Sequence, residues 1–141
     1  MDNYIKVTKD VLNQIDYENV IAIFIAEGGA MGEPNAFHAV LKDLTHYYTN
    51  LGEMDFTKEE FFNALPVMGS FNCFCEQIMG LEDGWIWYNA GFGNYLIVRK
   101  EYKNKIDKYI KEHFKENWQH GELYQNWLEM LNNIIGGIKN E

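Results

Sequence analysis

Two cysteines, Cys73 and Cys75, stand two residues apart in a chain of 141 residues and could act together chemically. On a β-strand this spacing turns both thiols to one face, where they could bind a soft metal. A structural zinc site requires four ligands, and no second pair of cysteines or histidines lies nearby in the sequence. A disulfide between them would strain the strand. We therefore expect two buried, reduced thiols and no bound metal.

The other residue types used in catalysis form no recognisable motif. The four histidines, whose spacing lacks a metal-binding pattern such as H-E-x-x-H, are His38, His46, His113 and His120. The single serine, Ser70, lies outside a G-x-S-x-G turn. Cys75 and His38 could form a nucleophile and its base only if the fold brought them together. We expect no catalytic residues and no cofactor.

A glycine-rich segment, Gly28–Gly32, follows the apolar run Val20–Ala26, as a phosphate-binding loop would. It lacks the G-x-G-x-x-G spacing and the Lys-Ser/Thr ending of such loops. Glu27 and Glu33 flank it, and their carboxylates would oppose phosphate binding. The segment is therefore interpreted as structural, or as an edge that contacts another protein through residues such as Met31.

Charge is unevenly distributed. Lys and Arg total 12 and Asp and Glu total 21, which gives a formal net charge of −9. The segment Arg99–Lys115 holds seven of the basic residues and three acids, so the rest of the chain is strongly acidic. Such a surface repels nucleic acid and anionic lipid and favours a basic protein partner. The alternative is that the acids serve solubility alone.

Length and hydropathy indicate one globular domain over residues 1–141. No apolar run approaches the ~20 residues that span a bilayer. The N-terminus lacks a basic region followed by an apolar core, so we expect a cytoplasmic protein with no membrane partner.

The clearest predicted element is a hairpin within Gly84–Lys100. Two β-favouring runs, Trp85–Tyr88 and Tyr95–Val98, flank a six-residue connection rich in Asn and Gly, Asn89–Asn94. Both faces of each run are apolar, which predicts a central place in a covered sheet.

Further strands and helices follow from local patterns. Strands are predicted at Val20–Ala26, Ala36–Leu41 and Leu44–Thr49, and a short helix is predicted after the cap residue Thr8. Thr57 and Glu60 have capping-box spacing, which predicts a helix as far as Leu65. The segment Val67–Leu81 is ambiguous and is assigned a short strand or loop.

Two stripes at helical spacing, from Tyr102 to Phe114 and from Leu123 to Ile138, predict amphipathic helices at the C-terminal end. The predicted fold is α+β, a mainly antiparallel sheet of about five strands covered by these two helices.

The segments AEGGAMGEPNAFHAVLKD at Ala26–Asp43 and GFGNYLIVRKEY at Gly91–Tyr102 resemble small acidic bacterial proteins of the polymorphic-toxin immunity type. The resemblance rests on glycine and strand motifs in the middle half of the chain. It implies an α+β fold and tight binding to a cognate toxin, and it assigns no binding residues.

The expected function is therefore that of an acidic inhibitor, an immunity or antitoxin-like protein that neutralises a toxin enzyme. Two alternatives are a phage-type anti-defence protein, which mimics DNA or sequesters a signal molecule, and a small-molecule-binding domain with its pocket beside His38 and Cys75. The predicted partner-binding residues are acids near glycine segments, with one Met and one aromatic nominated as an anchor: Glu27, Met31, Glu33, Glu53, Asp55, Glu82, Asp83 and Phe92. The alternative for Phe92 is that it folds back on its own sheet.

Overall fold

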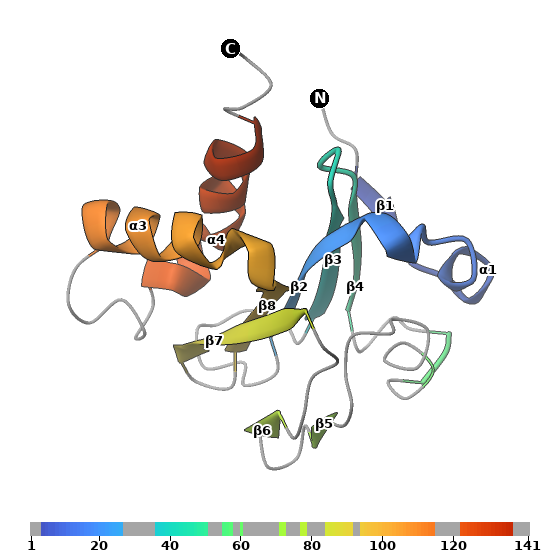
Figure 1. Cartoon of the computed structure of the whole chain (residues 1–141). Coiled ribbons are helices and arrows are strands. Elements are labelled where there is room, and N and C mark those ends of the chain that lie inside the picture. The colour runs from blue at the N-terminus through green and yellow to red at the C-terminus, as the bar shows by residue number, and fades with distance from the viewer. Residues whose placement is uncertain are drawn as a thin grey trace.

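The computed structural model describes residues 4–26, 36–50, 55–57, 60, 71–72, 77–78, 84–91, 94–114 and 122–136. A six-stranded sheet organises this part of the chain, in the order β1-β4-β3-β2-β8-β7 (Figure 1). Its strands are β1 (Tyr4–Lys6), β2 (Val20–Ala26), β3 (Ala36–Leu41), β4 (His46–Asn50), β7 (Trp85–Gly91) and β8 (Asn94–Arg99). The predicted α+β class is confirmed.

The sheet is mixed. Five strands pair in an antiparallel manner, whereas β1 pairs with β4 in parallel, with Tyr4 opposite His46 and Lys6 opposite Tyr48. The prediction of about five mainly antiparallel strands missed β1. This strand has three residues, all exposed, so it carries no apolar alternation that would reveal it.

The hairpin prediction was right in kind and wrong in two details. The strands β7 and β8 extend further than predicted, to Gly91 and from Asn94, because Asn89 pairs with Tyr95 and Gly91 pairs with Asn94. Only β8 is central, since it lies between β2 and β7, while β7 forms an edge of the described sheet. Trp87 on β7 is accordingly 43% exposed.

Two helices pack with one face of the sheet (Figure 1). They are α3 (Lys103–His113), which follows a 3₁₀ turn at Lys100–Tyr102, and α4 (Glu122–Leu131), which continues as a π-helical turn at Asn132–Gly136. Their buried residues form one core cluster with strand residues such as Phe24 and Leu96. The predicted helical stripes therefore correspond to real helices.

The opposite face carries a second core cluster, which includes Ile23, Ile25 and Phe37 of the strands. Val7, Leu12 and Ile15, from the segment around α1 (Lys9–Leu12), cover it. The side chain of Thr8 accepts a hydrogen bond from the Val11 amide at 3.3 Å, so the predicted cap is confirmed. A 3₁₀ turn at Tyr17–Asn19 leads into β2.

The predicted capping box is also present. The Thr57 amide donates to Glu60 Oε1 at 2.8 Å, and the Glu60 amide donates to Thr57 Oγ1 at 3.0 Å. The predicted end of that helix at Leu65 lies outside the described residues. Within the ambiguous segment, two short strands, β5 (Phe71–Asn72) and β6 (Gln77–Ile78), pair in an antiparallel manner as a separate two-stranded sheet. No helix in the described part of the chain is long and apolar enough to cross a membrane.

Candidate functional site

Asp55 is the one predicted partner-binding residue that the structure describes. The others lie outside the described residues: Glu27, Met31, Glu33, Glu53, Glu82, Asp83 and Phe92. Asp55 Oδ1 accepts a hydrogen bond from the Lys9 amide at 2.9 Å. It thereby satisfies one of the amides left unpaired at the start of α1. Asp55 is exposed, but it stabilises the fold at this position.

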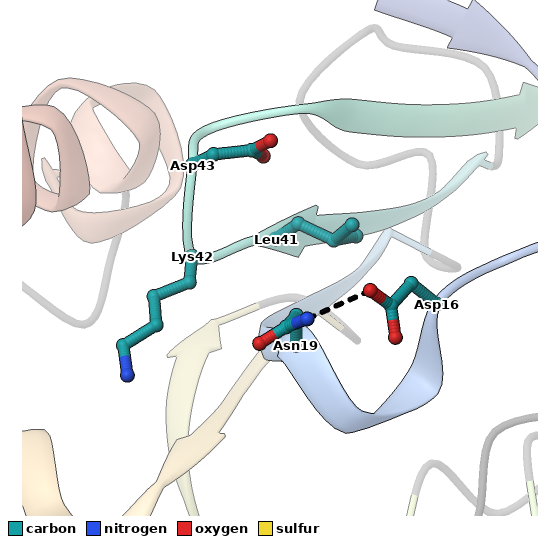
Figure 2. Close-up of a pocket in the computed structure, with 5 residues that line it drawn as sticks. All are labelled: Asp16, Asn19, Leu41, Lys42 and Asp43. Atoms are coloured by element: carbon teal, nitrogen blue, oxygen red, sulfur yellow. Dashed lines mark hydrogen bonds between the residues drawn. The ribbon is translucent and has the colours of Figure 1, made fainter.

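A surface pocket lies where β3 turns into β4, beside the 3₁₀ turn that leads into β2. Its volume is about 410 Å³, and it is lined by Asp16, Asn19, Leu41, Lys42 and Asp43 (Figure 2). None of these residues was among those predicted for function. Two carboxylates, an amide, an aliphatic side chain and one lysine thus line the open cavity.

Backbone and side-chain hydrogen bonds fix the walls of this pocket. The Lys42 amide donates to the Asn19 carbonyl at 2.8 Å and joins the β3–β4 turn to the 3₁₀ turn. Asn19 Nδ2 donates to Asp16 Oδ2 at 2.7 Å, and the Thr45 amide donates to Asp43 Oδ1 at 3.0 Å. Both carboxylates therefore have defined positions before any ligand arrives.

Figure 2 shows how the pocket side chains are arranged. Asp43 lies on one side of Leu41, and Asp16 with Asn19 lies on the other, while the Lys42 side chain points away from both carboxylates. An ionised carboxylate offers about four acceptor positions. The arrangement suits a cationic group whose aliphatic part rests on Leu41.

A smaller hollow of about 100 Å³ adjoins this pocket and shares Asn19 and Lys42 with it. Arg99 lines this hollow, and its guanidinium stabilises the fold by binding backbone carbonyls. Nε donates to the Val20 carbonyl at 2.7 Å, and Nη2 donates to the Glu18 carbonyl at 3.1 Å. The same group lies 4.6 Å from the ring centre of Trp85. Arg99 therefore holds the 3₁₀ turn that forms one wall of the pocket.

A second feature is a pair of histidines, half-buried His38 and buried His46, on the helix-covered face of the sheet. His38 Nδ1 and His46 Nε2 are 2.8 Å apart, which is hydrogen-bonding distance. The ring of Trp127 on α4 lies 5.4 Å from the ring of His38 and 5.8 Å from that of His46. On its other side His46 meets the ring of Tyr4 at 4.5 Å.

Both imidazoles are neutral at pH 7. Burial, together with the neighbouring His46, lowers the pKa of His38 to about 3, and burial lowers the pKa of His46 to about 4. One neutral ring therefore donates to the other. The described partner of His38 is His46. Cys75, which could have formed a nucleophile–base pair with His38 only if the fold brought them together, lies outside the described residues along with Cys73.

The histidine pair does not extend to a metal site in the described ranges. No group of three or more His, Cys, Asp or Glu residues lies close enough there to hold an ion. The signal that could have revealed the pair is the β3–β4 hairpin. Its register places Val40 opposite His46 and His38 opposite Tyr48, so the two histidines are diagonal neighbours on one face.

Comparison of the chain with models of protein families, with curated proteins and with solved structures finds no match.

Proposed function

We propose that the protein is an acidic binding protein of the immunity or antitoxin type, which inhibits a basic toxin enzyme by covering part of its surface. The observation that carries this proposal is the open pocket with Asp16 and Asp43 on either side of Leu41, in a chain whose net charge is −9. It suits a basic side chain better than an anion or an apolar group.

A lysine or arginine of the partner would enter this pocket. Its methylenes would contact Leu41, and its charged head would donate hydrogen bonds to the two carboxylates; such charge-assisted bonds are the stronger kind. Asp16 and Asp43 are already positioned by Asn19 and Thr45, so little side-chain freedom is lost on binding. The smaller hollow beside it is lined by two acids, Glu18 and Glu101, and by two cations, Lys42 and Arg99, so the excess of acidic groups belongs to the larger pocket.

The distribution of charge supports an oriented approach. The exposed lysines of α3 form a basic surface: Lys103, Lys105, Lys108 and Lys111. A basic enzyme is repelled by this helix and attracted by the acidic remainder of the molecule. At physiological ionic strength such fields reach ~8 Å, so the effect accelerates association at low salt and fades at high salt.

The test begins with chemical cross-linking in the native host, which identifies the partner enzyme. The enzyme and this protein are then purified separately, and the inhibition of the enzyme and its binding by surface plasmon resonance are measured at several salt concentrations. The double variant Asp16→Asn/Asp43→Asn keeps acceptors for Asn19 and Thr45 but loses both charges. We expect it to weaken inhibition at least tenfold, whereas Glu112→Gln on α3 leaves inhibition unchanged.

Binding that is independent of salt concentration and unchanged in the Asp16→Asn/Asp43→Asn variant would contradict the proposed role of the pocket. A captured partner that is acidic, or whose activity is unaffected by saturating protein, would contradict the proposed function as a whole.

A further inference from the structure

β1 is weakly attached to the molecule compared with the central strands. Its residues Tyr4–Lys6 are all exposed, with Tyr4 at 54% and Ile5 at 37%. It lies at the edge of the described sheet, where it pairs in parallel with β4 over three residues. The next backbone bond, from the Val7 amide to the Tyr48 carbonyl, is 2.8 Å long. Because β1 buries little apolar surface, its local opening costs less than opening of the sheet centre.

Tyr4 nevertheless covers a buried titratable group. Its ring meets the ring of His46 edge-on at 4.5 Å, and it also approaches Tyr48 at 6.2 Å. With this cover in place His46 is only 4% exposed. On the opposite side of His46 lies Trp127, whose ring stacks on Phe24 at 4.6 Å with an interplanar angle of 2°. Trp127 of α4 is thus firmly packed over His46, whereas Tyr4 of β1 is not.

The His38–His46 pair is built for the neutral state. The 2.8 Å separation holds one N–H between the two rings, and a second proton there would place two donors against each other. His46 Nδ1 is buried and has no hydrogen-bond partner among the described residues. A proton on that atom would become a buried charged donor without an acceptor, which is costly.

Among the described residues, nothing around His46 compensates for that charge. The titratable groups that face His46 are His38 from β3, Tyr4 from β1 and Tyr48 from β4, and Lys6 follows along β1 on the side of Tyr48. The groups from β2 and α4 are uncharged aromatic rings. No carboxylate in the described part of the chain acts on either imidazole.

We propose that β1 is an acid-released strap: protonation of His46 drives Tyr4 and the rest of β1 off β4 while the remaining sheet stays folded. The strand that yields is β1 because α4 is held by many buried residues, including Leu123, Met130 and Leu131, all at most 1% exposed. Release gives His46 access to water and leaves the outer edge of β4 unpaired.

The size of the effect follows from proton linkage. His46 in water binds a proton below pH 6.5, whereas the covered residue, with a pKa of about 4, does so only at lower pH. Between these values the open state binds more protons, so acid favours opening. If opening restores the ordinary pKa, lowering the pH from 7 to 5 raises the opening equilibrium roughly twentyfold.

Hydrogen exchange with mass spectrometry tests the strap on the intact chain. Exchange rates for peptides of β1 and β4 are corrected for the intrinsic pH dependence and compared at pH 7 and pH 5. We expect protection of β1 and of the edge of β4 to fall between fivefold and twentyfold, with β2, β8 and α4 unchanged. His46→Gln places an amide near the position of Nε2 and cannot titrate, so in this variant the protection of β1 should be the same at pH 7 and pH 5. His113→Gln, at an exposed position of α3, retains it.

A second measurement does not depend on the folding of His46→Gln. Tyr4→Ala removes the cover, and NMR titration of the His46 ring in that variant should show its pKa moved toward 6.5. The proposal is overturned if β1 keeps the same protection at both pH values, if all elements open together, or if His46→Gln retains the pH dependence. An unchanged His46 pKa in Tyr4→Ala would also overturn it.

Discussion

The hydroxyl of Tyr88 donates a hydrogen bond to Asp107 Oδ1 at 2.7 Å and so joins the edge strand β7 to helix α3. Asp107 Oδ2 in turn accepts from Lys103 Nζ, also at 2.7 Å, one helical turn earlier. Burial raises the pKa of Tyr88, and the bond to Asp107 raises it further. For Asp107, burial favours a higher pKa, but the bonds from Lys103 and Tyr88 hold the pKa below its usual value.

The contribution of this contact can be isolated with a double-mutant cycle. Tyr88→Phe removes the hydroxyl alone, and we expect the free energy of unfolding to fall by about 1 kcal/mol, the usual value for one hydrogen bond. In an Asp107→Asn background the same change should cost less, because the charged acceptor is already gone. Urea titrations of the four proteins measure both effects. Equal costs in the two backgrounds would show that the bond does not form in solution.

The same contact predicts how stability changes in alkali. The folded-state pKa of Tyr88 is raised above 10, so above pH 10 the unfolded chain releases a proton that the folded protein retains. The unfolded state then binds fewer protons, and stability must fall as the pH rises. The pKa values of Tyr17 and Tyr102 are raised as well, so Tyr88→Phe should reduce this slope without abolishing it. Unfolding titrations at pH 8, 9.5 and 10.5 provide the comparison.

Two tryptophans that look equivalent in sequence should respond very differently to truncation. Trp127 is 7% exposed and stacks on Phe24, so Trp127→Ala should cost about 3 kcal/mol or more. Trp87 is 43% exposed and meets Tyr95 at one side, so Trp87→Ala should cost less than about 1 kcal/mol. Denaturant titrations measure both losses in unfolding free energy, provided that the variants share the same dependence of that free energy on denaturant concentration. Similar losses at both positions would contradict the edge placement of β7.

The sequence predicted those elements whose signal is local. Val20–Ala26 is a continuous apolar run, and Ala36–Leu41 is apolar apart from His38; the structure has both strands with the predicted bounds. The capping box at Thr57 and Glu60 depends on residues three apart, and it too is present. β1 could not be recognised, because its three exposed residues are held by a parallel partner far away in the sequence.

The candidate site was harder to predict because it depends on contacts between distant segments. The pocket forms where the Lys42 amide donates a hydrogen bond to the Asn19 carbonyl. No local sequence pattern around either residue predicts that contact. The neutral state of His38 and His46 depends on strand register and on cover by Trp127 and Tyr4. Neither histidine stands out by spacing. Net charge, by contrast, is visible in composition, and it led to the expectation of a basic partner.

Arg99 offers a test of the pocket wall. Its guanidinium bonds the carbonyls of Val20 and Glu18 and lies over Trp85, a geometry that a lysine ammonium cannot reproduce. Arg99→Lys keeps the charge, so a loss of about 2 kcal/mol in unfolding free energy would report the lost fork of hydrogen bonds. Lys100→Met, at the exposed neighbouring position, is the matched control and should change stability by less than about 0.5 kcal/mol.

Arg99→Lys should also affect binding of the partner, because it changes the positions of the pocket residues and leaves the net charge unchanged. With Arg99 replaced, the 3₁₀ turn at Tyr17–Asn19 loses the hydrogen bonds to its Tyr17 and Glu18 carbonyls, so Asp16 and Asn19 are held less firmly at the pocket. We expect Arg99→Lys to speed dissociation from the basic partner while the salt dependence of association stays as in the wild type, because net charge is unchanged. A variant that is as stable as the wild type would show that the turn is held by other contacts.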